Sequence, residues 1–328
     1  MYSLHHAIGG SEVYAKILAT FPTLFSRLAL PFQKTGGGSE VRAKILAAFP
    51  RTSLALHYLC HMQLIEVDIK GKRPDQQLCE DGYVLTPDFA AVVDGSTSKV
   101  AGRHGGRLAM QTVCTAIQLL PPEADKWEML THLTQALAAL NPLRATHEAQ
   151  YRLTCSAVIF SVRRRVVWLA GDCQCRWGGH TFQNPKMVDS VLTQIRTDAL
   201  RYLLAHGHTV PELRQNDLGR ACIADALREQ TNFQNCPDPA NPYAYPVLDG
   251  TPVCASQVPE LSVPAEVKEC ILASDGYPQL ADTLQQSEEC LHTLLQTDPL
   301  CMDANAATKG WMEGNSSFDD RCYLRIAI

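Results

Sequence analysis

The sequence predicts an α+β sandwich, and three observations point to it. Predicted strand pairs come first, predicted helices stand in the middle, and predicted strands return at the C-terminus. This order differs from the regular alternation of strands and helices that builds a parallel sheet. No glycine-rich phosphate loop of either common type follows a predicted strand, which argues against a nucleotide-binding α/β fold. The 328 residues are enough to bury a large core.

The N-terminal part of the chain contains a near-identical repeat. Residues 9–22 read GGSEVYAKILATFP and residues 37–50 read GGSEVRAKILAAFP. Each copy predicts a short helix, because helix-starting residues precede apolar residues three and four apart and a proline follows. We therefore predict a helical arm over residues 1–57 and a second domain over residues 58–328. The arm is interpreted as a docking or self-association element, as helices packed on the main domain, or as a recent duplication or cloning artefact.

The second domain shows strand and helix patterns in turn. Strands are predicted over residues 63–69, 82–85, 89–93, 155–162, 166–170, 270–273 and 322–328. Helices are predicted over residues 105–120, 127–140, 187–205, 211–230 and 284–295. Two of the strand pairs are predicted hairpins, through Thr-Pro-Asp and through three successive arginines, and a proline- and asparagine-rich loop covers residues 235–245.

Composition excludes several classes of protein. The balance of 29 basic and 34 acidic residues argues against a protein that binds nucleic acid through bulk charge. No stretch reaches the roughly 20 apolar residues that cross a bilayer, so no membrane association is expected. The 13 cysteines are scattered, and the C-x-C of Cys173 and Cys175 has no histidine or second pair at zinc spacing. Reduced, mostly buried thiols in a cytoplasmic protein are expected.

Acidic residues stand at the ends of the predicted strands. Asp94, Asp172 and Asp275 directly follow apolar runs, Asp319-Asp320 precedes the last strand, and Glu80-Asp81 opens the strand before Asp94. One Asp-Gly is most simply a turn. An ordered set converging at one sheet edge would repel itself unless cations lay between the carboxylates. Ligation by oxygen alone suits Mg²⁺ or Mn²⁺ rather than zinc.

The ordered set resembles the metal-dependent serine/threonine protein phosphatases, the PPM or type 2C family, and its bacterial branches in particular. The matching stretches are CEDG at 79–82, FAAVVDG at 89–95, the strand pair of 156–172, ILASDG at 271–276, and Asp319-Asp320. The resemblance covers about residues 60–328 and implies a four-layer αββα sandwich, with two antiparallel sheets flanked by helices.

The resemblance also implies a site with two Mn²⁺ or Mg²⁺ ions at one end of the sandwich. Asp94 would bridge both ions, Glu80 and the Gly95 carbonyl would complete one site with support from Asp81, and Asp275 and Asp319 would complete the other. Asp172 is a possible ligand of a third ion. A water shared by the ions would attack phosphorus in line.

The chain departs from the family pattern at three positions. Gln76 stands where the family has a phosphate-binding arginine, Ser96 where eukaryotic members have a histidine, and Gln279 where an aspartate is common. Lys99 is the first candidate to replace the arginine as a catalytic cation, and Arg103 is the second. Arg107, on the same helical face as Arg103, is interpreted as a solvated helix charge.

The sequence therefore predicts a metal-dependent phosphatase that hydrolyses phosphomonoesters, with phosphoserine and phosphothreonine on proteins as the expected substrates. One alternative is an inactive phosphatase fold that binds a partner, docked through the N-terminal arm. Another is a phosphatase of small metabolites, because specificity lies in loops such as the insert between His180 and Pro252.

Overall fold

The computed structural model describes residues 62–100, 105–238 and 240–328, all within one compact unit, Met62–Ile328. The predicted N-terminal arm and Arg103 lie outside these residues. The described strands are β1 Gln63–Lys70, β2 Asp81–Leu85, β3 Phe89–Gly95, β4 Cys155–Ser161, β5 Val166–Ala170, β6 Gln174–Trp177, β7 His180–Phe182, β8 Glu260–Ser262, β9 Glu269–Ala273 and β10 Arg321–Ala327.

The strands form two five-stranded sheets. The first sheet has the order β1-β10-β9-β6-β7 and the second the order β2-β3-β4-β5-β8. Each pairing within them is antiparallel. The three strands absent from the prediction, β6, β7 and β8, have only three or four residues each and lie toward the edges of the sheets.

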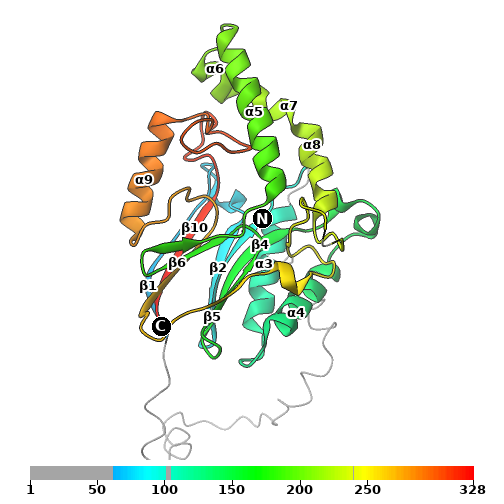
Figure 1. The fold of residues 1–328 in the computed structure, drawn as a ribbon, viewed down its shortest axis with the longest axis vertical. Coiled ribbons are helices and arrows are strands. Elements are labelled where there is room, and N and C mark those ends of the chain that lie inside the picture. The colour runs from blue at the N-terminus through cyan, green and yellow to red at the C-terminus, as the bar shows by residue number, and fades with distance from the viewer. Residues whose placement is uncertain (1–61, 101–104, 239) are drawn as a thin grey trace, which may run out of the picture. The chain divides into compact units, whose positions relative to one another are not determined.

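The described helices are α3 Gly105–Gln118, α4 Lys126–Ala138, α5 Met187–Ala205, α6 Val210–Gln215, α7 Leu218–Cys222, α8 Ala224–Glu229 and α9 Leu284–Thr297. Short 3₁₀ turns cover Gln76–Leu78, Leu143–Thr146, Ala149–Tyr151, Gln230–Phe233 and Ala255–Gln257. Helices α3 and α4 lie on one side of the sheets and α9 on the other, while α5 to α8 project beyond one end (Figure 1).

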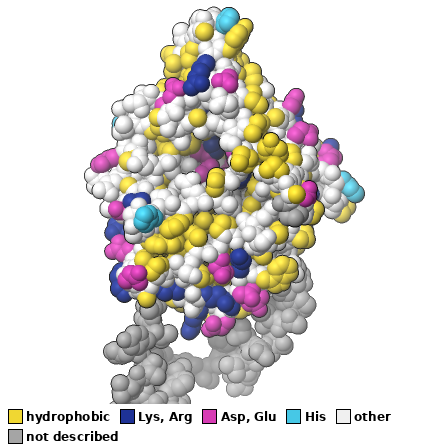
Figure 2. All heavy atoms as spheres, viewed as in Figure 1, with side chains coloured by type: hydrophobic (Ala, Val, Ile, Leu, Met, Phe, Trp, Pro, Cys, Tyr) yellow, Lys and Arg dark blue, Asp and Glu magenta, His cyan; other side chains and the backbone are white. Residues whose placement is uncertain are grey.

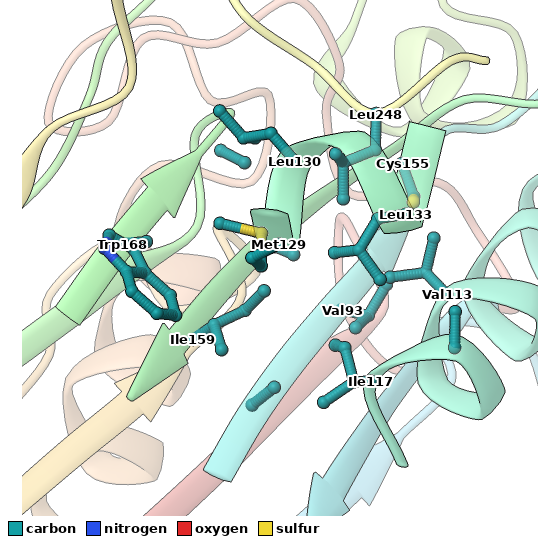
Figure 3. Packing of buried hydrophobic residues seen from close by; sticks show 14 of the residues in the cluster. Val93, Val113, Ile117, Met129, Leu130, Leu133, Cys155, Ile159, Trp168 and Leu248 are labelled. Atoms are coloured by element: carbon teal, nitrogen blue, oxygen red, sulfur yellow. The ribbon is translucent and has the colours of Figure 1, made fainter. Parts of the chain in front are cut away.

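Successive side chains along the strands of the second sheet point to opposite faces and so contribute to two separate hydrophobic cores. Ala90 and Val92 face the first sheet and pack with Val158, Leu272 and Leu324 between the sheets. The alternate residues of β3, β4 and β5 face α3 and α4 instead. Figure 3 shows this second core, in which Val93, Ile159 and Trp168 of the strands meet Val113 and Ile117 of α3 and Met129, Leu130 and Leu133 of α4.

Helix α9 forms the fourth layer. Its Leu284 packs against Ile271, Tyr277 and Tyr323 on the outer face of the first sheet. Its Glu288 accepts hydrogen bonds from the Arg321 guanidinium (2.7 and 2.9 Å) and from the Tyr277 hydroxyl (2.8 Å). The order of layers is helix, sheet, sheet, helix, so the predicted four-layer sandwich is confirmed.

The prediction of one helix over residues 211–230 is wrong, because three short helices occupy this stretch. Asn216 ends α6 in an extended conformation, with φ −143° and ψ 103°. The Asp217 side chain then accepts from the Arg220 backbone N–H and caps α7. Asn and Asp side chains compete with the helical hydrogen bonds in this way, and the helical spacing of apolar residues does not reveal it.

The cysteines behave as small apolar residues. Of the twelve in the described chain, all are free and seven are buried. Cys173 and Cys175 face the core between the sheets, so the C-x-C is part of the packing. None of the helices between Met62 and Ile328 that the structure describes is long and apolar enough to cross a membrane.

Candidate active site

The acidic residues predicted at strand ends gather at one edge of the two sheets. Antiparallel pairing places Asp81 opposite Asp94, and Asp94 opposite Ser156. Asp172 follows β5, Asp275 follows β9, and Asp319-Asp320 precedes β10. Asp94, Asp172, Asp275, Asp319 and Asp320 all line one cavity of about 730 Å³. Acidic and basic side chains are visible in the recess below the projecting helices (Figure 2).

Glu80 is held at this edge because the backbone at Gly95 and Gly106 packs closely against it. Its backbone oxygen accepts from the Gly95 N–H (3.0 Å), and its Oε2 accepts a hydrogen bond from the Thr97 hydroxyl. A Cβ at Gly106 would lie 2.5 Å from Glu80 Oε1 and 2.6 Å from the Gly95 carbonyl oxygen. A glycine is therefore needed where α3 passes this carboxylate.

Asp81 is buried and Asp94 beside it is half-buried, and neither carboxylate has an ion pair within the described chain. Burial, followed by repulsion from Asp320 and Asp275, raises the pKa of Asp81 to about 7. Burial and the charges of Asp81, Asp275 and Asp172 raise the pKa of Asp94 well above its usual range, although Lys309 opposes the rise. Asp81 Oδ2 is buried and has no hydrogen-bond partner within the described chain. These carboxylates would ionise more easily beside a cation.

Asp172 is already paired. Its carboxylate accepts from the Ser156 hydroxyl (2.5 Å) and lies 2.6 Å from the Lys186 ammonium. Burial alone would raise the pKa of Asp172, but Lys186 and Ser156 outweigh burial and hold it at about 2. Gly171 makes this turn with φ +106°, and a Cβ there would overlap Ser156. Asp172 is therefore an anion neutralised by the protein's own lysine.

Asp319 is also engaged by lysines. The Lys72 ammonium lies 2.9 Å from Asp319 Oδ1 and 3.7 Å from Asp320 Oδ2, and Lys309 forms an ion pair with Asp319 Oδ2. Asp320 accepts from the backbone N–H groups of Lys72 (2.7 Å) and Glu80 (3.1 Å). Asp320 thus ties the start of β10 to the start of β2, while Asp319 faces the cavity.

The residues discussed as phosphate ligands lie in different surroundings. Gln76 exchanges hydrogen bonds with Gly71 and donates to the Arg73 carbonyl (2.8 Å), so its amide is used within its own loop. Arg107, interpreted from the sequence as a solvated charge, instead donates to the Cys79 carbonyl (2.7 Å) beside Glu80. Lys99 lines the cavity and donates to the Thr97 carbonyl (3.1 Å).

Sequence reasoning missed the lysines that pair with the carboxylates. Lys72, Lys186 and Lys309 come from three loops far apart in the chain, and no local motif marks them. Burial, and then the charges of Arg220, Lys309 and Lys186, lower the pKa of Lys99 to about 7. One side of the cavity is therefore rich in cations.

Carboxylate oxygens are suitable ligands for a divalent metal ion, but here they do not surround a common point at coordination distance. No group of three or more His, Cys, Asp or Glu side chains is placed to hold an ion within residues 62–100, 105–238 and 240–328. The unpartnered Asp81 oxygen and the raised pKa of Asp94 fit a cation beside Asp81, Asp94 and Asp275. At Asp319 an ion would have to displace Lys72 and Lys309.

The fold is similar to solved structures of several bacterial proteins. PppA, a key regulatory component of T6SS in Pseudomonas aeruginosa, is 15% identical over 82% of this chain and 98% of that chain, with a TM-score of 0.43. The Mycobacterium tuberculosis serine/threonine phosphatase PstP/Ppp is 16% identical over 81% and 98%, with a TM-score of 0.40. The Staphylococcus aureus serine/threonine phosphatase Stp1 is 12% identical over 81% and 96%, with a TM-score of 0.42.

No protein-family model and no curated protein matches the sequence.

Proposed function

We propose that the domain beginning near residue 58 is a metal-dependent phosphatase that hydrolyses phosphomonoesters, with phosphoserine and phosphothreonine on proteins as substrates. One observation carries the proposal: acidic residues from the ends of β2, β3, β5, β9 and β10 meet at one edge of the sandwich. Neither the buried carboxylate of Asp81 nor the half-buried carboxylate of Asp94 has a protein cation at salt-bridge distance within the described chain. Such a pair is costly in the folded state unless a ligand offsets its charge.

Two Mn²⁺ or Mg²⁺ ions are the proposed cofactors. Asp94 would contact both, Glu80, Asp81 and the Gly95 carbonyl would hold one, and Asp275 and Asp319 would hold the other. When bound, the ions supply Lewis acidity toward a water molecule and positive charge toward the phosphoryl oxygens. Asp172 is retained as a possible further ligand, although its carboxylate would have to leave Lys186.

The chain itself contributes proton control at Asp81 and Asp94. Because burial and mutual repulsion raise both pKa values, the pair retains a proton near neutral pH in the metal-free protein. Loading of a cation beside the pair would release that proton.

Lysines supply the cations that orient the phosphoryl group. Lys309 pairs with Asp319 and, like Lys99, lines the cavity. A phosphoryl group between Lys99 and Lys309 would accept hydrogen bonds from both ammonium groups. These bonds would replace those of the family's phosphate-binding arginine, whose position is occupied by Gln76. Lys99 remains the proposed catalytic cation, with Arg103 as the second candidate.

A binding role without catalysis is the second candidate function. The ion pairs of Lys72 and Lys309 with Asp319 favour it, because they neutralise one proposed ligand without a metal. In that case the cavity would hold an anionic partner group and release no phosphate.

Phosphate release from matched substrates tests the proposed substrate class. With Mn²⁺ present, we expect kcat/KM to be higher for phosphoserine and phosphothreonine peptides than for small esters such as glycerol phosphate. A preference for the small esters would contradict the protein-substrate proposal and favour a metabolite phosphatase.

A further inference from the structure

Three cations that line the cavity, Arg73, Lys99 and Arg220, have no carboxylate partner within the described chain. Neither Lys99 nor Arg220 lies within 4 Å of an acidic oxygen in the described chain, whereas Lys186 and Lys309 are paired with Asp172 and Asp319. Arg220 donates from Nη1 to the Thr308 carbonyl. Its Nε and Nη2 donate to no atom of the described chain and are not among the buried unpartnered groups. They are therefore available to a ligand.

Arg220 is held rigidly. Its backbone N–H is capped by Asp217 Oδ1 (2.8 Å), and Asp217 Oδ2 accepts from the Arg196 guanidinium (2.8 and 3.1 Å). Arg196 is completely buried and also donates to the carbonyls of Leu300, Cys301 and Ala307. Helix α7 is thereby fixed to the loop that carries Thr308 and Lys309. A guanidinium on such a support is pre-organised for recognition.

Arg220 belongs to helix α7 of the insert, whereas the acidic edge is formed by strand ends of the sandwich. The charges that act most strongly on Lys99 are those of Arg220, Lys309 and Lys186, followed by Asp189. The charges that act most strongly on Asp94 are Asp81, Asp275, Asp172 and Lys309. Lys309 is common to both sets, while Arg220 belongs only to the first. Thr308, whose carbonyl accepts from Arg220, directly precedes Lys309, which pairs with Asp319, so this loop connects Arg220 to the acidic edge.

We propose that Arg220 binds a second anionic group of the substrate, so that the preferred substrate is a phosphomonoester carrying a further phosphate or carboxylate. This inference rests on the proposed phosphatase function. The phosphoryl group to be cleaved would lie at Lys309 and Lys99, and the second anion would meet the free edge of the guanidinium, which pairs well with planar carboxylates and with phosphate. An anion there would offset the positive charge now crowded around Lys99.

Binding of bisphosphonates tests the site without any catalysis. Titration calorimetry on the metal-free full chain would compare methylphosphonate with alkane bisphosphonates of one to four carbons. We expect at least one bisphosphonate to bind more tightly than methylphosphonate, and Arg220→Gln to weaken it about tenfold or more. Arg220→Lys should recover part of the loss. Equal affinity for the single and double anions, at all four lengths, would overturn the inference.

Arg214→Gln is the matched control. Arg214 lies on the neighbouring helix α6 and donates to the Trp311 carbonyl (3.0 Å) of the same loop, but it does not line the cavity. It should leave bisphosphonate binding unchanged. An equal loss in both variants would show that Arg220 acts only by fixing the loop, and would also overturn the inference.

Turnover then identifies the source of the second anion. Two phosphoserine peptides are compared, one with a neighbouring glutamate and one with glutamine in its place. If the second anion belongs to a peptide, the wild-type protein should prefer the glutamate peptide, and Arg220→Gln should reduce this preference in kcat/KM about tenfold. If Arg220→Gln instead reduces only the preference for small bisphosphate esters over monophosphate esters, the second anion belongs to a metabolite. If the bisphosphonates bind as expected but nothing is hydrolysed, the anion site stands and the phosphatase function fails.

Discussion

Asp94 is the residue on which the chemistry of the site converges. It stands at the end of a buried strand, opposite both Asp81 and Ser156, and four charged groups act on its carboxylate. The sequence predicted this aspartate, because strand-end positions can be read from an apolar run followed by Asp-Gly. The lysines around it could not be predicted, because Lys72, Lys186 and Lys309 approach from loops whose paths depend on tertiary packing.

Asp94→Asn and Asp275→Asn should each reduce metal-dependent turnover more than about a hundredfold, since each removes a charged oxygen ligand. The fold should persist, because each side chain faces the cavity. Kinetics and Mn²⁺ calorimetry check this. Asp88→Asn is the matched control at the opposite end of the β2–β3 hairpin, where Asp88 pairs with Arg163. Lost activity with wild-type metal affinity would contradict the proposed role as ligand.

The metal-free protein should lose stability as the pH rises. Asp81 has a folded-state pKa of about 7, above its value near 4 in the unfolded chain, and the pKa of Asp94 is also raised. The folded state therefore binds more protons between about pH 4 and pH 7, so this contribution is largest at acid pH and is lost as pH rises through the folded pKa. Melting temperatures measured at several pH values check this, and Asp94→Asn should reduce their dependence on pH.

Saturating Mn²⁺ should raise the melting temperature most at high pH. A melting temperature that Mn²⁺ does not change would contradict the metal site.

Lys309→Met should strengthen Mn²⁺ binding about tenfold while lowering kcat/KM, because the ammonium pairs with Asp319 and, in the proposed mechanism, would also contact the phosphoryl group. Calorimetry and steady-state kinetics separate the two effects. Lys126→Met, at a lysine that donates to the Val258 carbonyl away from the cavity, should change neither. Weaker Mn²⁺ binding in Lys309→Met would show that Lys309 supports the site instead of competing for it.

The helical insert is the element that gives this sandwich its particular cavity wall. Sequence periodicity predicted α5 at its observed bounds and the long strands and α9 to within two residues, because each has a clear apolar face. It failed at α6 to α8, where capping by Asp217 divides the helix, and at β6 to β8, which are too short to show alternation.

Arg196→Met should lower the free energy of unfolding by about 3 kcal/mol, because it removes the buried guanidinium that donates to Asp217 Oδ2 and to the carbonyls of Leu300, Cys301 and Ala307. Urea denaturation measures the loss. Arg201→Met, one and a half turns further along α5, is the control, since its pairs with Asp198 and Asp303 are exposed. Similar small losses in both variants would show that Arg196 does not anchor the insert.

At the scale of the whole molecule, two antiparallel sheets bring five strand ends to one edge, and this arrangement explains how acidic residues more than 200 positions apart share one cavity. The N-terminal arm, by contrast, contributes no residue to the motif set. Deleting residues 1–57 should therefore spare hydrolysis of a small aryl phosphate, measured against the full chain, and alter only self-association or partner choice. A folded truncation without activity would show that the arm helps to build the site.

Hydrolysis of 4-nitrophenyl phosphate by the full chain, in Mn²⁺, in Mg²⁺ and in excess chelator, tests the central claim most directly. We predict turnover with either ion, none in chelator, and recovery when the ion is restored. Asp94→Asn, assayed beside it, should remain inactive throughout and exclude a contaminating phosphatase. A folded wild-type protein that shows no turnover with either ion would contradict the proposed phosphatase and leave the binding role in its place.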